Sequence, residues 1–298
     1  MEYNILGKTG FSISRVSFGC MSLQSKAADN DILIRQAIDS GINLFDTADL
    51  YEHGENERLL GAALKGMRQQ AYISTKVGNR WKPDGSGWDW CPQKDYILQA
   101  VNKSLERLQT DYIDLYLLHG GTMEDPFDEV IEAFERLKDA GKIRQYGISS
   151  IRPNVIRHCV LNYDIAAVMT QYSYLDRRPE EETLPLLQKG NIGVMARGTI
   201  AGGLLIDKPA KLYLGMQEDE VKAIADDFKA NIPEGTTAVE AAIGYVLAHP
   251  AVSTAVAGIR TTGQLREIVD SERNHSLTRI QWDKLAGLNV PLLYTDHR

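Results

Sequence analysis

Short apolar runs recur along the chain, and each is followed by a stretch in which apolar residues return every three to four positions. A brief continuous apolar run is typical of a buried strand, whereas the 3.6-residue period is typical of an amphipathic helix. Eight strands are predicted, over residues 16–19, 42–45, 71–77, 113–118, 143–148, 167–171, 193–196 and 254–257.

Helical patterns fill the intervals between these runs. Asp29 or Asn30 is expected to cap the first helix, and Gly41 to end it. The other helices are predicted over 57–64, 95–108, 127–140, 153–161, 180–189, 218–230, 238–249 and 263–271.

Strands that alternate with helices at this rhythm indicate a parallel sheet. Eight units without a composition break favour a closed (β/α)8 barrel over an open sheet. We therefore predict an α/β fold with one barrel domain over residues 1–298, a β-hairpin over 3–15 and an extra helix over 279–288. Segment 78–93, rich in Trp, Gly and Pro, is predicted to be a loop.

Composition and charge exclude several classes of partner. The formal net charge is -7 and basic residues do not cluster in runs, which argues against nucleic acid. No apolar stretch reaches the length of a membrane span, and the N-terminus lacks a signal-peptide pattern. Three widely spaced cysteines, Cys20, Cys91 and Cys159, favour reduced thiols and a cytoplasmic protein. Cys91, in the polar segment, is expected to be the most exposed of them.

Polar side chains stand at the ends of successive predicted strands. Asp46 ends the second strand, Tyr51 follows in its loop, Lys76 lies near the end of the third strand and His119 follows the fourth. In a (β/α)8 barrel, catalytic residues gather at the C-terminal ends of the strands. Each residue alone also has a structural explanation, as a turn residue, a solvated lysine or a packed histidine, but their joint occurrence at one end favours an active site.

This set suits the reduction of a carbonyl group, which needs a hydride on carbon and a proton on oxygen. Tyr51 would donate the proton, because an ammonium beside a phenol favours its ionised form. Asp46 would keep Lys76 charged, since an unpaired buried ammonium is costly. His119 would orient the carbonyl or relay its proton. The hydride must come from a cofactor, although no Gly-x-Gly-x-x-Gly follows any predicted strand.

The sequence resembles the aldo-keto reductases over essentially its full length. The matching stretches are Phe45–Tyr51, Gly54–Glu57, Ile73–Lys76, Asp111–His119, Gly141–Arg144, Tyr146–Ser149 and Gln171–Ser173. The resemblance implies a (β/α)8 barrel, a preference for NADPH over NADH, and a catalytic tetrad of Asp46, Tyr51, Lys76 and His119 with Tyr51 as the general acid. The Gly120-Gly121-Thr122 sequence after His119 departs from the family's commoner His-x-Pro-Asp ending.

The resemblance also implies where the nicotinamide half of the cofactor binds. Ser149 and Gln171 match positions that hold the carboxamide, whereas Ser150 stands where the family usually has Asn. Arg197 takes the place of the usual stacking aromatic, and it would either stack on the nicotinamide or reach the pyrophosphate. The glycine-rich turn that would face the pyrophosphate contributes Gly198, Gly202 and Gly203.

The adenosine half is expected after the eighth strand. Gly258 would bring its backbone to a phosphate, and Arg260 is the candidate for the 2′-phosphate of NADPH because its guanidinium suits phosphate bidentately. Gln264 and Glu267 match adenine and ribose positions, whereas Ile268 departs from the usual Asn.

The substrate pocket is expected to draw on Met21, Trp81 and Trp88, although anchoring of their loop explains the two tryptophans equally well. We predict an NADPH-dependent reductase of small aldehydes, with ketones as a further class, acting as a monomer. One alternative is a barrel that senses NADPH and acts through a protein partner. Another, a metal-dependent hydrolase, would need histidines and carboxylates together at the strand ends, and the six histidines do not show that placement.

Overall fold

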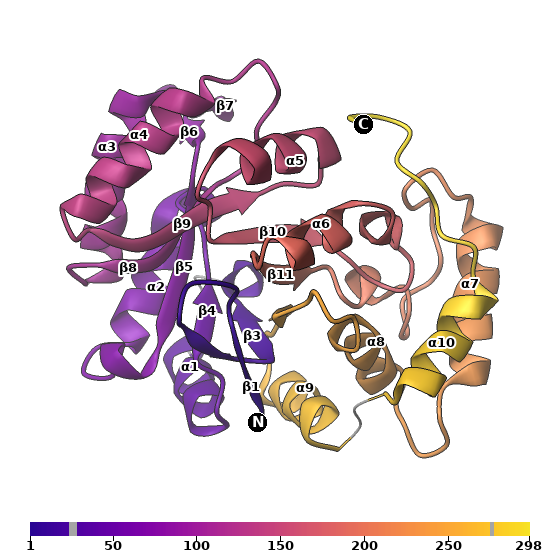
Figure 1. Ribbon diagram of the computed structural model, residues 1–298. Coiled ribbons are helices and arrows are strands. Elements are labelled where there is room, and N and C mark those ends of the chain that lie inside the picture. The colour runs from indigo at the N-terminus through magenta and orange to yellow at the C-terminus, as the bar shows by residue number, and fades with distance from the viewer. Residues whose placement is uncertain (24–28, 275–276) are drawn as a thin grey trace.

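Eight parallel strands close into a barrel in the computed structural model, which describes residues 1–23, 29–274 and 277–298 (Figure 1). Pairing of Ala255 with Val16 joins the last strand to the first and closes the ring. The predicted (β/α)8 fold is confirmed. The barrel strands are β3 (Val16–Gly19), β4 (Leu44–Asp46), β5 (Tyr72–Val77), β8 (Ile113–Leu118), β9 (Ile143–Ser149), β10 (Ala167–Gln171), β11 (Gly193–Arg197) and β12 (Thr254–Gly258).

Helices surround this ring (Figure 1). In the helix over 127–139, Val130, Phe134 and Leu137 are buried at spacings of three and four, so one face packs against the strands. Of the two predicted capping residues, Asp29 occupies the N-cap position of the first helix, although its side chain makes no capping hydrogen bond. The helices are α1 (Asn30–Asp39), α2 (Glu55–Ala63), α3 (Lys94–Leu108), α4 (Phe127–Asp139), α5 (Pro153–Asn162), α6 (Thr183–Lys189), α7 (Glu218–Asn231), α8 (Ala238–Leu247), α9 (Thr262–Asn274) and α10 (Arg279–Leu288).

The N-terminal hairpin closes one end of the barrel. Strands β1 (Tyr3–Ile5) and β2 (Ser12–Ser14) pair antiparallel, as predicted. Leu6, which follows β1, and Ile13, in β2, are fully buried in one cluster with residues of the barrel interior. Gly7 has a φ of +51°, and a Cβ there would lie 2.2 Å from the backbone nitrogen of Gly193, so this close approach requires glycine. The hairpin therefore covers the end of the barrel at which Gly193 begins β11.

Segment 78–93 is not the loop that was predicted. It contains a two-stranded antiparallel ribbon, β6 (Asn79–Trp81) and β7 (Trp88–Trp90). Trp88 and Trp90 alternate with a polar residue, which is a strand pattern. The prediction gave more weight to the many Gly and Pro residues of the segment. Cys91 after the ribbon is only 4% exposed, so its predicted exposure was also wrong.

The chain beyond α10 runs back over the molecule toward α5 and α6 (Figure 1). The backbone N–H of Asn154, in α5, donates to the carbonyl of His297 over 2.8 Å. Tyr294 is buried, with 6% of its surface exposed. Within residues 1–23, 29–274 and 277–298, no helix combines the length and apolar character needed to cross a bilayer.

Candidate active site

Three neighbouring strands bring the polar residues predicted from the sequence to one end of the barrel. Asp46 is the last residue of β4, Lys76 lies one residue before the end of β5, and His119 directly follows β8. The order β4–β5–β8 makes these strands adjacent, and parallel strands end on the same side. Tyr51 begins the short 3-10 helix Tyr51–Gly54 that follows β4.

Lys76 is the centre of this cluster. Its ammonium Nζ donates to Asp46 Oδ2 over 2.6 Å and to the carbonyl of Thr47 over 2.6 Å, and it lies 3.5 Å from the phenol oxygen of Tyr51. The Lys76 side chain is 1% exposed and that of Asp46 is 6% exposed. The ammonium is thus removed from water and points at the one phenol of the cluster.

Burial and charge act in opposition on the buried pair. Burial by itself would lower the pKa of Lys76, but Asp46 and Tyr51 raise it above its ordinary value. Burial raises the pKa of Asp46, and the Lys76 ammonium opposes that rise. The lysine therefore stays protonated at neutral pH and holds a positive charge beside Tyr51.

The segment that carries Tyr51 has an unusual backbone, and Trp81 supports it. Glu52 and His53 both lie in the left-handed region, with φ of 47° and 58°. The Trp81 indole N–H donates to the carbonyl of Leu50 over 3.2 Å, and its ring stacks on His53 at 3.6 Å between centroids. These contacts favour the loop-anchoring interpretation of Trp81.

His119 faces the same phenol. Its ring lies 5.9 Å from that of Tyr51 in an edge-on arrangement. Burial, the Lys76 ammonium and the Arg197 guanidinium lower the pKa of His119 to about 3. Among the described residues, Nδ1 of His119 is a buried atom without a hydrogen-bond partner. The imidazole is therefore neutral at physiological pH.

A neutral buried histidine makes folding less favourable in acid. The unfolded chain takes up this proton near the ordinary value of about 6.5, whereas the folded chain does so only near about 3. When the pH is lowered from about 7 to about 5, the free energy of unfolding should fall for the native chain. The fall should be about 2 kcal/mol larger than that of the His119→Asn variant. Urea titrations at both pH values measure this, and equal losses would show that His119 titrates normally in the folded state.

The residues predicted to bind nicotinamide lie at the ends of β9, β10 and β11. Ser149 is the last residue of β9, and the hydroxyl of Ser150 accepts from the backbone N–H of Arg152 over 3.2 Å. Gln171 and Arg197 are paired across β10 and β11, and Arg197 Nη1 donates to Gln171 Oε1 over 2.7 Å. Arg197 also acts on the pKa of both His119 and Asp46, so its charge lies near the tetrad.

The predicted phosphate-facing glycines lie farther along the same rim. Gly198 has a φ of +71° and follows Arg197, and a Cβ there would lie 3.4 Å from the side chain of Gln171. Gly202 and Gly203, in the 3-10 helix Ala201–Gly203, have φ of +66° and +99°. Gly202 is exposed, so its backbone is open to a ligand.

The predicted adenosine residues surround the junction of β12 and α9. Gly258 and Arg260 are exposed there. Gln264 Oε1 accepts from the backbone N–H of Arg260 over 2.9 Å, so this side chain shapes the turn that presents the guanidinium. Glu267 lies one turn beyond Gln264 on α9 and is exposed.

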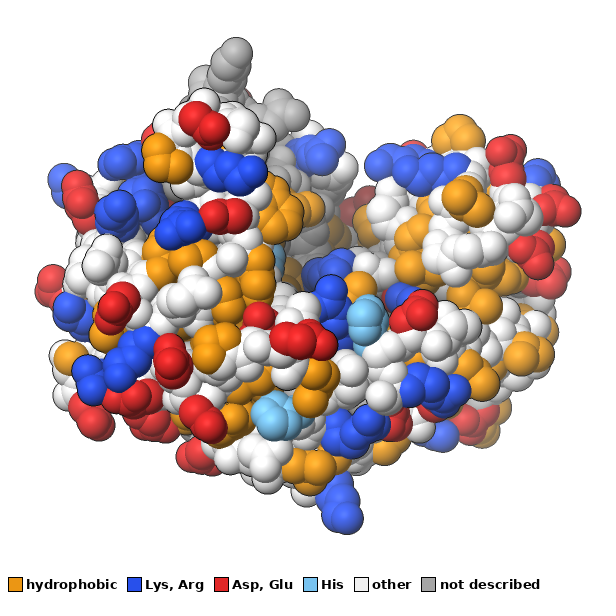
Figure 2. Space-filling model, turned by 90° about the horizontal axis from the view of Figure 1, so that it is seen from above, with side chains coloured by type: hydrophobic (Ala, Val, Ile, Leu, Met, Phe, Trp, Pro, Cys, Tyr) orange, Lys and Arg blue, Asp and Glu red, His pale blue; other side chains and the backbone are white. Residues whose placement is uncertain are grey.

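The other two predicted substrate residues are exposed at the surface. Met21 is 70% exposed and Trp88 is 51% exposed. Figure 2 shows a hollow between two raised parts of the surface, with acidic and basic side chains interspersed on the face in view.

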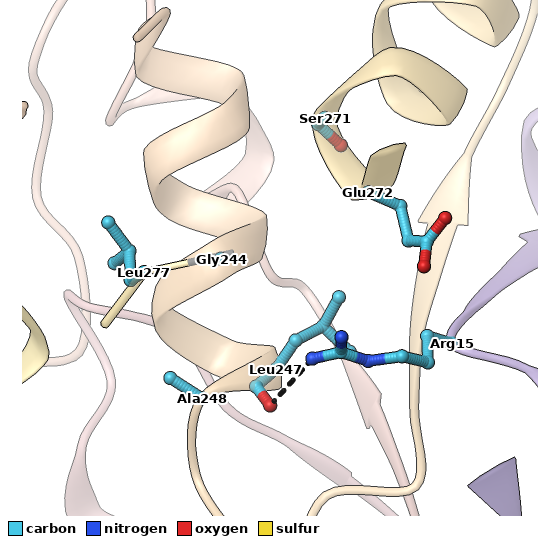
Figure 3. Close-up of a pocket in the computed structure, with 7 residues that line it drawn as sticks. All are labelled: Arg15, Gly244, Leu247, Ala248, Ser271, Glu272 and Leu277. Carbon is cyan, nitrogen blue, oxygen red and sulfur yellow. Dashed lines mark hydrogen bonds between the residues drawn. The ribbon is translucent and has the colours of Figure 1, made fainter. Parts of the chain in front are cut away.

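A separate cavity lies at the opposite end of the barrel (Figure 3). Arg15, which precedes β3, donates to the carbonyl of Leu247 over 3.3 Å and to Glu2 over 2.7 Å. Glu272, 5% exposed, accepts from the backbone N–H of Glu2 over 2.8 Å. This end of a barrel serves stability, and these bonds tie the N-terminal segment to α8 and α9.

Sequence reasoning missed three contributors to the site. The Thr47 carbonyl binds Lys76, and Asp176 and Tyr213 both contact the side-chain amide of Gln171. Asp176 lies in the loop after β10 and Tyr213 in the long segment after β11, where no periodicity marks a residue. Among the described residues, no three His, Cys, Asp or Glu side chains lie close enough together to hold a metal ion.

Comparison with known proteins agrees with this geometry. The sequence profile of the aldo/keto reductase family matches residues 15–290. The uncharacterized oxidoreductase YqkF of Bacillus subtilis is 44% identical, with all of both chains covered. The solved structure of aldo-keto reductase AKR11C1 from Bacillus halodurans, in its holo form, matches with a TM-score of 0.95 at 44% identity, covering 100% of this chain and 99% of that one. Aldo-keto reductase yakc [NADP(+)] of Schizosaccharomyces pombe is 31% identical over 65% of this chain and 60% of its own. The chain belongs to the aldo/keto reductase family.

Proposed function

We propose that this chain reduces small aldehydes, and ketones as a further class, to alcohols with NADPH as the hydride donor. One observation carries the proposal: a buried ammonium, Lys76, bonds Asp46 at 2.6 Å and points at the phenol of Tyr51 from 3.5 Å. A buried cation beside a phenol lowers the cost of removing its proton. The pair thus suits proton delivery to a carbonyl oxygen.

Each member of the tetrad has a separate task in this mechanism. Tyr51 gives its proton to the substrate oxygen as that oxygen gains negative charge. Lys76 stabilises the phenolate left behind, and Asp46 holds the ammonium in place. His119 is neutral, with a pKa of about 3, so it orients the carbonyl by hydrogen bonding without a competing charge.

The rim residues fit a nicotinamide dinucleotide. Gly202 offers exposed backbone at a left-handed turn, Gly258 is open to solvent, and Arg260 is exposed at the start of α9. When bound, NADPH supplies the hydride. Ser149, Ser150 and Gln171 would hold its carboxamide, because they lie at the strand ends beside the tetrad.

Arg197 is assigned to the nicotinamide end. Its guanidinium bonds Gln171 at 2.7 Å and influences the pKa of His119. The bond to Gln171, which belongs to the proposed carboxamide site, favours a place beside the reacting ring over one at the pyrophosphate. The guanidinium is planar and could cover a ring face.

The name of one relative supports the choice of cofactor. The yakc relative carries NADP(+) in its name, and the holo form of the matching Bacillus structure is consistent with a bound cofactor without naming it. The remaining assignments, a single domain over residues 1–298 that acts as a cytoplasmic monomer on a small carbonyl substrate, belong to the same proposal.

Absorbance at the NADPH band tests the proposal. With an aromatic aldehyde such as 4-nitrobenzaldehyde, the native chain should oxidise NADPH and form the alcohol in equal amounts. Tight binding of NADPH without turnover over a broad aldehyde panel would contradict it and favour the sensor alternative.

The same assay tests Arg260. Arg260→Ala should raise the KM for NADPH by about tenfold or more, because a charge-assisted bond to the 2′-phosphate is lost. The KM for NADH, which lacks that phosphate, should stay within about twofold. Equal changes for both cofactors would remove Arg260 from the 2′-phosphate site.

A further inference from the structure

Asp176 is a buried acidic residue that the mechanism above does not use. It follows β10 in the loop over 172–177 and is 1% exposed. Its Oδ2 accepts from the side-chain Nε2 of Gln171 over 2.8 Å. A buried carboxylate bonded to a residue of the proposed carboxamide site can act on the cofactor through that residue.

The partners of Gln171 fix the orientation of its amide. A side-chain amide has an oxygen that accepts and a nitrogen that donates, and the two ends are nearly equal in shape. Asp176 is a carboxylate and only accepts, whereas Arg197, which binds Oε1 over 2.7 Å, only donates. If the amide turned over, its nitrogen would face the donor Arg197 and its oxygen would face the acceptor Asp176, so both hydrogen bonds would be lost.

Counting the bonds shows what the amide can still offer. The nitrogen Nε2 carries two N–H groups, and these go to Asp176 and to the Tyr213 hydroxyl over 3.2 Å. The oxygen Oε1 accepts two bonds, of which Arg197 supplies one. One acceptor direction therefore remains on Gln171, and no donor.

We propose that Asp176 is a positioning residue that holds Gln171 with its oxygen toward the cofactor, so that the site selects the amino group of the nicotinamide carboxamide. This rests on the proposed use of NADPH. A dinucleotide whose carboxamide amino group is replaced by methyl would offer Gln171 no donor.

An arginine holds the Asp176 carboxylate in place, as Arg197 holds the oxygen of Gln171. Arg178 binds the carboxylate bidentately, with Nε to Oδ1 at 2.7 Å and Nη2 to Oδ2 at 2.9 Å. The guanidinium of Arg178 in turn covers the ring of Tyr294 at 5.0 Å from its centroid. The orientation of Gln171 is thus supported from the C-terminal segment of the chain.

The test is a ratio of dissociation constants measured by isothermal titration calorimetry with NADP⁺ and with its 3-acetylpyridine analogue, which lacks the amino group. The native chain should bind NADP⁺ about tenfold more tightly than the analogue, as one buried hydrogen bond allows. In Asp176→Asn the side chain at 176 can donate as well as accept, so only Arg197 still opposes a turned Gln171, and the ratio should fall at least about twofold below the native value.

Asp114→Asn is the matched control. Asp114 is also buried and also bonded to arginine, in its case to Arg68 at 2.7 Å and Arg144 at 2.8 Å, but it lies near the start of β8 at the other end of the barrel. It should lose stability and keep the native ratio. If Asp176→Asn does not fold, Arg178→Lys, which lacks the bidentate fork, should lower the ratio in the same direction.

The outcomes separate the two proposals. In one outcome, the native chain prefers NADP⁺ over the analogue while Asp176→Asn keeps the same preference as the control Asp114→Asn. That result would overturn the positioning role alone. A native chain that does not bind NADP⁺ would overturn the proposed cofactor and this role together.

Discussion

Tyr51→Phe lowers kcat for aldehyde reduction by about 10²- to 10⁴-fold, the usual contribution of a general acid. The substitution removes only the phenol oxygen, and the ring can keep its edge-on contact with His119 at 5.9 Å between centroids. The dissociation constant for NADPH should change little, because the predicted cofactor residues lie on other strands. Single-turnover absorbance measurements with saturating NADPH report this step directly.

A second tyrosine provides the control for this variant. Tyr112 donates to Gln69 Oε1 over 3.2 Å and precedes β8, at the end of the barrel away from the tetrad. Tyr112→Phe should leave kcat unchanged. If Tyr51→Phe keeps more than about a tenth of native kcat, proton delivery by Tyr51 is refuted, since a general acid contributes more than that.

Lys76→Met destabilises the fold by about 3–5 kcal/mol, the usual cost of breaking a buried ion pair from one side. The Asp46 side chain, 6% exposed, would be left without the ammonium that bonds it at 2.6 Å. Activity should also be lost, because no cation faces Tyr51. Urea denaturation gives the free energy, and the aldehyde assay gives kcat.

The double variant separates the two effects of Lys76. Asp46→Asn with Lys76→Met removes both charges, so most of the lost stability should return. The activity should not return, because the positive charge beside Tyr51 is still missing. Recovery of kcat together with stability would mean that Lys76 serves the fold alone.

The barrel could be predicted because its periodicities are strong and regular. Each barrel strand is a run of largely buried residues, such as Ile113–Leu118, and the eight runs repeat in order. The β6–β7 ribbon was missed because Gly and Pro around its turn pointed to a loop, although Trp88 and Trp90 alternate as in a strand. The burial of Cys91 followed from that ribbon, since its N–H bonds the carbonyl of Gly78 at 2.7 Å.

The meeting of Asp46, Lys76 and His119 was predictable for a different reason. Parallel strands share one direction, so residues at their ends must gather on one side. The contacts of Gln171 were not predictable in this way. Asp176 and Tyr213 reach it from irregular segments, whose paths depend on the finished tertiary structure.

Pairing of β3 with β12 has a consequence for how the chain is made. The first barrel strand, complete by Gly19, finds its second neighbour only at Thr254–Gly258, more than 230 residues later. Gly7 likewise packs against Gly193, which is far away in the sequence. Contacts between such distant segments are slow to form and follow the local ones. The ring therefore closes only after residues 254–258 have left the ribosome, and until then both edges of the growing sheet need protection from other chains.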